Sequence, residues 1–182
     1  MSEETTHFTF YSRENGKDKD GTFWVVFTRS REVTSWKNMI SLMKLGTNGG
    51  SKKISGVDLY AHGGVAAGSY FFYVGDDMIS SNAVKVWGRQ LKSVAPYFTK
   101  DAIFNLHVCA AGHADSFLTA LATESGITFR ACRDLQNPNI NARPEGPTKL
   151  FVPGAKSGKK ESKDPWRDEN GKRIVKNHWA FI

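Results

Sequence analysis

The sequence predicts a single α/β domain, specifically a three-layer α/β/α sandwich with a mainly parallel sheet. Short apolar runs of the length of buried strands alternate with segments whose apolar residues recur every three or four positions. This repeated strand–helix order implies right-handed crossovers and parallel strands covered by helices on both faces. The chain has 182 residues, 40% of them hydrophobic, which is enough for one packed core. We therefore expect residues 1–182 to form one domain.

The expected elements follow from apolar periodicity and from glycine or proline at their ends. Residues 23–27 (Phe-Trp-Val-Val-Phe) are typical of a strand buried on both faces and should begin the sheet. Gly46 and Gly126 stand where two helices should end. The expected strands are residues 23–27, 54–61, 70–74, 102–108 and 127–132, with short closing strands at 149–152 and 178–182. The expected helices are residues 34–45, 80–98 and 114–125.

The N-terminal segment is expected to be polar and to lack a targeting signal. Residues 1–20 form a polar N-terminal segment, without an apolar signal core at residues 1–6, and no run of about 18 apolar residues occurs. With only two cysteines, Cys109 and Cys132, both at the ends of apolar runs, a disulfide framework is not indicated. We expect a cytoplasmic protein without membrane contact, or one delivered by a non-Sec route.

Residues 153–172 are expected to form a mobile basic loop, which contributes to the net charge of +7. Several close lysines favour acidic partners, although the charge alone does not indicate a nucleic-acid-binding protein. A non-catalytic α/β binding or inhibitory module that uses this basic surface is therefore an alternative function. The lysines of the cluster are Lys156, Lys159, Lys160 and Lys163.

The candidate active site consists of a histidine and a cysteine at the ends of two expected strands. His62 follows the strand at residues 54–61, and Cys109 follows the strand at residues 102–108. Ligand sites in parallel sheets form beyond the carboxyl ends of the strands, so the two side chains should face each other. A nearby imidazole and a following helix N-terminus both favour the thiolate form of cysteine. The N–H groups of Gly63 and Cys109 are candidates to hold an oxyanion.

The two strand ends resemble those of the caspase-like (clan CD) cysteine peptidases, including bacterial toxin-associated members. The resemblance rests on residues 58–64 (Asp-Leu-Tyr-Ala-His-Gly-Gly) and 105–112 (Asn-Leu-His-Val-Cys-Ala-Ala-Gly), and it extends from about residue 23 to residue 134. It implies a caspase-like fold and a cysteine endopeptidase, either a bacterial effector or a regulated protease, acting on a protein or peptide. His62 would be the general acid/base, Cys109 the nucleophile, and Asp134 a candidate for the substrate pocket. No cofactor is implied.

A second chemistry is open for the same residues. Two imidazoles and a thiolate can bind zinc and leave a position for water, so a zinc-dependent hydrolase that uses His62 and Cys109 is an alternative. His107 and His113 are the further candidate ligands. Cys132 is interpreted as a core residue, because it has an apolar neighbour and no His-Gly partner.

Overall fold

The computed structural model describes residues 4–12, 30–66, 68–109, 111–132 and 148–161. The expected strands at residues 23–27 and 178–182, as well as Asp134 and Lys163, lie outside these ranges. The strands are β1 (Thr5–Ser12), β2 (Arg31–Val33), β3 (Lys53–Tyr60), β4 (Gly63–Ala66), β5 (Ser69–Val74), β6 (Asp77–Ser80), β7 (Phe98–His107), β8 (Phe129–Cys132), β9 (Thr148–Phe151) and β10 (Lys159–Lys160). The α-helices are α1 (Trp36–Gly46), α2 (Val84–Lys92) and α3 (Asp115–Ser125).

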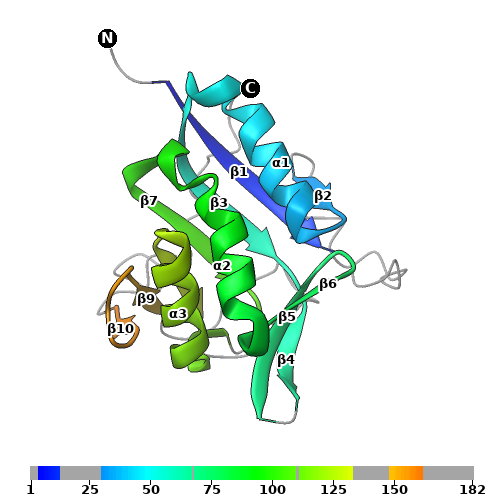
Figure 1. Ribbon diagram of the computed structural model, residues 1–182, viewed down its shortest axis with the longest axis vertical. Helices are drawn as coiled ribbons and strands as arrows, with labels where there is room; N and C mark the ends of the chain where they lie inside the picture. The colour runs from blue at the N-terminus through cyan, green and yellow to red at the C-terminus, as the bar shows by residue number, and fades with distance from the viewer. Residues whose placement is uncertain (1–3, 13–29, 67, 110, 133–147, 162–182) are drawn as a thin grey trace, which may run out of the picture.

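The main sheet has seven strands in the order β10-β9-β8-β7-β3-β1-β2 (Figure 1). Five adjacent strands, β8, β7, β3, β1 and β2, are parallel to one another. Strand β9 is antiparallel to β8, and β10 is antiparallel to β9. The prediction of an α/β fold with a mainly parallel sheet is confirmed. The carboxyl ends of β3 and β7 consequently lie at the same edge of the sheet.

The three described helices pack on one face of this sheet (Figure 1). Each helix connects two parallel strands, and the steps from β2 to β3, from β3 to β7 and from β7 to β8 all run in the same direction across the sheet. Right-handed crossovers that step in the same direction place their helices on the same side. The second helical layer of the expected sandwich is thus not part of the described residues.

Strand β1 is an element that the sequence analysis did not predict, because it assigned residues 1–20 to a polar segment. Thr5–Ser12 instead forms a strand that pairs in parallel with β3 on one side and with the edge strand β2 on the other. Its threonines and aromatic residues are good strand formers and alternate over part of its length, a signal that mean polarity conceals. One face of β1 packs beside α1, where the Phe8 ring lies against Gly46.

The helix expected over residues 80–98 is shorter in the structure. It covers Val84–Lys92, is preceded by strand β6 and a 3₁₀ turn, and is followed by the 3₁₀ turn Ala95–Tyr97. Pro96 lacks an N–H donor and disfavours the α conformation of the residue before it, so the helix cannot continue to Phe98. Phe98 begins β7 instead.

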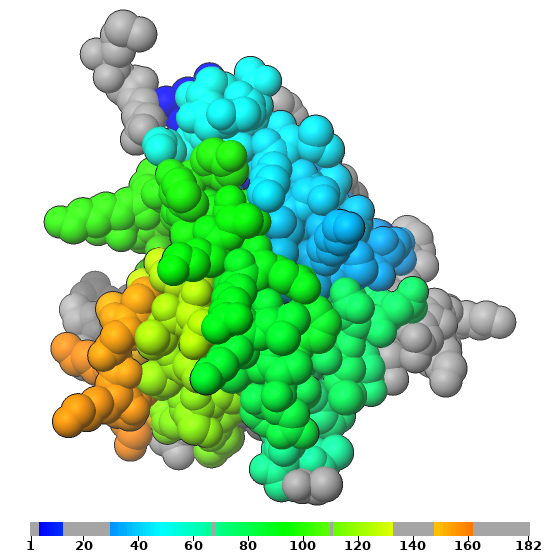
Figure 2. All heavy atoms as spheres, in the orientation of Figure 1, coloured from blue at the N-terminus to red at the C-terminus, as the bar shows by residue number. Residues whose placement is uncertain are grey.

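Strands β4, β5 and β6 form a separate antiparallel sheet between the end of β3 and the start of α2. In the space-filling view, this small sheet projects from the end of the molecule below the helices (Figure 2). Two contacts fix it to the end of β1 and to the start of α1. The backbone N–H of Gly75 donates to Ser12 Oγ at 2.7 Å, and the N–H of Trp36 donates to the Asp77 carboxylate at 2.9 Å.

The turn between β5 and β6 should tolerate only glycine at position 75. Gly75 has φ of 59°, and a Cβ there would lie 2.0 Å from the backbone of Thr34. We expect Gly75→Ala to lower the free energy of unfolding by about 3 kcal/mol or more, because backbone must move. Gly49→Ala is the matched control, with φ of 67° and open space around the added methyl, and should cost only about 1 kcal/mol. Urea denaturation of both variants measures the difference, and equal losses would contradict this account.

Candidate active site

The register of β3 and β7 brings the positions of His62 and Cys109 to the same edge of the sheet. Tyr60 and His107 are paired residues of the two parallel strands, and His62 and Cys109 each follow two positions later. The N–H of Ala61 donates to the carbonyl of His107 at 3.4 Å, which continues the contact beyond the strands. Both His62 and Cys109 are half-buried. The structure therefore agrees with the expectation that His62 and Cys109 follow two strands that end at the same edge of the sheet.

Gly63 lies where the small sheet meets the end of β7. A Cβ at this position would fall 2.4 Å from the Val108 side chain and 2.8 Å from the carbonyl oxygen of Phe71, so only glycine fits. The N–H of Tyr73 donates to the His62 carbonyl at 2.9 Å, which makes Gly63 and Phe72 a non-hydrogen-bonded antiparallel pair. The N–H of Gly63 is consequently directed away from β5, as an oxyanion donor would require.

Tyr70 connects the small sheet to the backbone of Cys109. Its hydroxyl donates a hydrogen bond to the Cys109 carbonyl at 2.9 Å. Burial raises the pKa of the Tyr70 phenol, and the nearby Cys109 and Cys132 thiols raise it further. The phenol therefore stays protonated as a donor and anchors the segment that carries Cys109.

Cys132 and His113 both lie near Tyr70, the residue that is hydrogen-bonded to Cys109. Cys132 is fully buried at the end of β8, as expected for a core residue. His113 is exposed in the 3₁₀ turn before α3, where it lines a pocket of about 200 Å³ together with Tyr70 and Ser116. Within the part of the chain that the structure describes, no group of three or more potential ligands is arranged to hold a metal ion.

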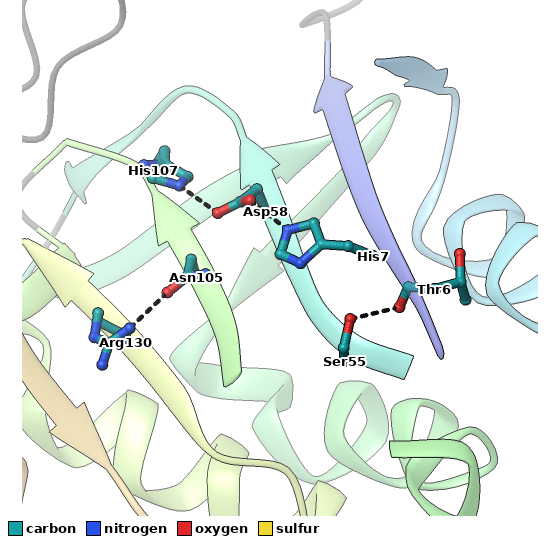
Figure 3. Close-up of polar contacts among 7 residues, drawn as sticks. All are labelled: Thr6, His7, Ser55, Asp58, Asn105, His107 and Arg130. Carbon is teal, nitrogen blue, oxygen red and sulfur yellow. Dashed lines mark hydrogen bonds and ion pairs between the residues drawn. The ribbon is translucent and has the colours of Figure 1, made fainter. Parts of the chain in front are cut away.

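A charged cluster, defined as His7, Asp58 and His107, lies on the sheet face opposite the helices (Figure 3). The three residues come from the adjacent strands β1, β3 and β7. Asp58 contacts His7 Nε2 at 2.6 Å and His107 Nε2 at 2.8 Å, one through each carboxylate oxygen. The His107 ring stacks on Tyr60 with centroids 4.1 Å apart. These contacts fix the ring of His107 two residues before Cys109.

The electrostatics of the cluster depend on its central carboxylate. Burial alone would raise the pKa of Asp58, but the hydrogen bonds from His107 and His7 hold it well below its usual value. The His7 ring lies over Gly56, where a Cβ would be 2.7 Å from it. Asp58 is therefore an ionised group that links three strands.

A second ion pair lies on the same face of the sheet, toward the edge formed by β9 and β10. Arg130 of β8 makes two hydrogen bonds of 2.8 Å to Glu161 and one of 3.4 Å to Asn105. Glu161 also accepts a hydrogen bond from Thr148, and these contacts lower its pKa although burial opposes this. The contact attaches the segment after β10 to the central sheet.

Asp58 and His7 are site residues that the sequence analysis missed. Asp58 was part of the motif at residues 58–64 that contains His62, but a single carboxylate in an apolar strand gave no indication of its partners. His7 lay in the segment considered polar, and His107 was considered only as a zinc ligand. An unpaired charge in a strand that is otherwise apolar is the signal that could have identified Asp58, because a buried carboxylate requires a partner.

Comparisons with protein-family models, curated proteins and solved structures find no match for this chain. Among the described residues, no helix is both long and apolar enough to cross a lipid bilayer.

The lowered pKa of Asp58 predicts a specific acid dependence of stability. A carboxyl group with a lowered pKa in the folded state stabilises the fold above its unfolded pKa of about 4, and this contribution disappears as pH falls toward the folded value. Asp58→Asn should reduce the free energy of unfolding at pH 7 by about 1–3 kcal/mol. The difference from the wild type should shrink steadily between pH 5 and pH 3.

Urea denaturation across this pH range measures the effect. Asp101→Asn is the control, because Asp101 is an exposed carboxylate on β7, and it should give a small and constant difference. A wild-type advantage over Asp58→Asn that does not change with pH would contradict the assignment.

Proposed function

We propose that this protein is a cysteine endopeptidase of the caspase-like type, with Cys109 as nucleophile and His62 as general acid/base. The observation that carries the proposal is the register of Tyr60 with His107, which sets His62 and Cys109 at equivalent positions beyond two adjacent parallel strands. The carboxyl edge of a parallel sheet is where α/β enzymes bind their ligands. A protein or peptide is the proposed substrate, and the cytoplasm of the host or of a target cell is the proposed site of action.

The local structure after each strand supports this assignment. Gly63 sits against Val108 with no room for a side chain, so the His62 and Cys109 segments approach each other closely. After Cys109, the chain makes the 3₁₀ turn Ala111–His113 and enters α3, whose N-terminus favours negative charge nearby. The proposal includes a caspase-like three-layer architecture.

The proposed reaction passes through a thioester. His62 takes the proton from Cys109, and the thiolate attacks the carbonyl carbon of the scissile peptide bond. The N–H groups of Gly63 and Cys109 would hold the oxyanion of the tetrahedral intermediate. His62 returns the proton to the amide nitrogen, and the C–N bond breaks. Water that is deprotonated by His62 then attacks the thioester, releasing the carboxylic acid product and restoring the thiol.

The first prediction of this function is a fast and selective modification of Cys109. A thiol-reactive peptide electrophile at neutral pH should add once to the wild-type chain, as measured by intact-protein mass spectrometry. Cys109→Ala should abolish the addition, and His62→Ala should slow it about 100-fold, within the usual contribution of a general base. Cys132→Ala is the matched control, because Cys132 is fully buried, and it should label at the wild-type rate. Slow labelling that is indifferent to His62 would overturn the proposal.

A binding function for the basic hairpin is the second candidate, favoured by the exposure of its lysines. Lys156, Lys159 and Lys160 are exposed on and beside the β9–β10 hairpin. The hairpin itself is held to α3, because Lys149 and the N–H of Gly158 both bond to Asp115. A fixed array of cations can bind an acidic partner by electrostatic attraction.

This candidate predicts a salt-dependent interaction that is independent of Cys109. Replacing Lys156, Lys159 and Lys160 with glutamine should weaken binding to a polyanion such as heparin about tenfold or more at low salt, measured by fluorescence anisotropy. Replacing Lys37, Lys85 and Lys92 of α1 and α2 provides a charge-matched control. Equal weakening by both triple variants would show that only the net charge matters.

A further inference from the structure

We propose that the charged cluster His7–Asp58–His107 positions and tunes Cys109, with His107 acting as a positioning residue between Asp58 and the thiol. This inference deepens the proposed function and rests on it. The cluster contains the charged contact nearest in sequence to Cys109, and the thioester chemistry described above does not use it.

The strand geometry places His107 directly before the thiol. Side chains alternate between the two faces of a strand, and Val108 belongs to the core on the helix side. Cys109 comes directly after Val108, where a turn begins, because the N–H of Ala111 donates to the Val108 carbonyl at 3.3 Å. Two residues of chain span at most about 7 Å between Cα atoms, so Cys109 stays close to the position of His107.

Three contacts fix the orientation of His107. Its Nε2 contacts Asp58 at 2.8 Å, and its ring is nearly parallel to Tyr60 at an interplanar angle of 6°. The His107 side chain is only 3% exposed, so it has little freedom to leave this position. His7 contacts the other oxygen of Asp58 at 2.6 Å and orients the carboxylate from the far side.

The arrangement has an electrostatic consequence for a thiolate at Cys109. The negative charge of Asp58 would oppose ionisation of the thiol, and the N–H groups of His107 and His7 compensate it. Other titratable or charged groups share this face through β1, β2, β3, β8 and the segment after β10. Among the residues that the structure describes, they include Glu32 of β2, which accepts a hydrogen bond from Tyr11 at 3.2 Å. The others are Tyr11, Tyr60, Cys132, Arg130 and Glu161, of which Arg130 and Glu161 neutralise each other.

The test is the pH profile of Cys109 alkylation by iodoacetamide, a small reagent that needs no peptide-binding subsite. His107→Phe keeps an aromatic ring to stack on Tyr60 but removes the donor to Asp58. Asp58, which is paired with Asn105 four residues before Cys109, then keeps only half of its compensation. We expect the midpoint of the profile to rise by about half a pH unit.

Two further variants distinguish this role from a structural one. Adding Asp58→Asn to His107→Phe removes the charge and should return the midpoint to the wild-type value. If the effect of His107→Phe were purely structural, the second substitution would move the midpoint further from the wild-type value. His107→Gln, whose amide can still donate to Asp58, should keep the wild-type midpoint. Circular dichroism and thermal unfolding define a temperature at which all three variants are folded, and the alkylation profiles are compared at that temperature.

The outcomes separate this inference from the proposed function. Wild-type Cys109 that labels quickly and depends on His62, with the same midpoint in His107→Phe, would overturn the role of His107 and leave the dyad intact. A rise in His107→Phe that persists in the double variant would also overturn it, because the charge of Asp58 would then not be the cause. Wild-type labelling that is slow and indifferent to His62 would overturn both.

Discussion

Tyr60 and His107 stack face to face across β3 and β7, with ring centroids 4.1 Å apart, and the candidate site depends on this contact. Paired residues on parallel strands share one level of the sheet, so the next turn of each chain leaves the sheet at the same height. A slip of one residue would move the His62 position to the opposite face, because side chains alternate with period two. The stack and the contact of Asp58 with His107 both join β3 to β7 on the polar face of the sheet, and a slip would break them.

The small sheet β4–β5–β6 determines what happens immediately beyond the strand ends. It begins at Gly63, which has no room for a side chain beside Val108, and it returns Tyr70 to the Cys109 carbonyl. The same sheet is fixed to the N-terminus of α1 through Asp77, and to the end of β1 through the hydrogen bond from Gly75 to Ser12. Contacts to α1 and β1 thus support, through the small sheet, the segment that carries Cys109, and the two sheets should respond to substitutions as one unit.

The polar face of the main sheet contrasts with the apolar face under the helices. Burying a carboxylate such as Asp58 is unfavourable unless partners compensate it, and His7 and His107 do so from both neighbouring strands. At the far edge, Arg130 and Glu161 form a matched pair with two hydrogen bonds. Contacts of this kind are directional, so they select one register and one strand order where apolar packing alone is tolerant.

The sequence by itself determined the α/β class, the mainly parallel sheet and the two strand ends that carry His62 and Cys109. These features follow from local periodicity, from glycines such as Gly126, and from the rule that parallel strands end at a common edge. It could not determine the position of β1, the end of α2 before Pro96, or the partners of Asp58. His7 and Asp58 are 51 residues apart, and no local pattern encodes a contact between them. Only the strand order of the folded sheet brings that imidazole to the carboxylate, because pairing across the sheet depends on the whole core.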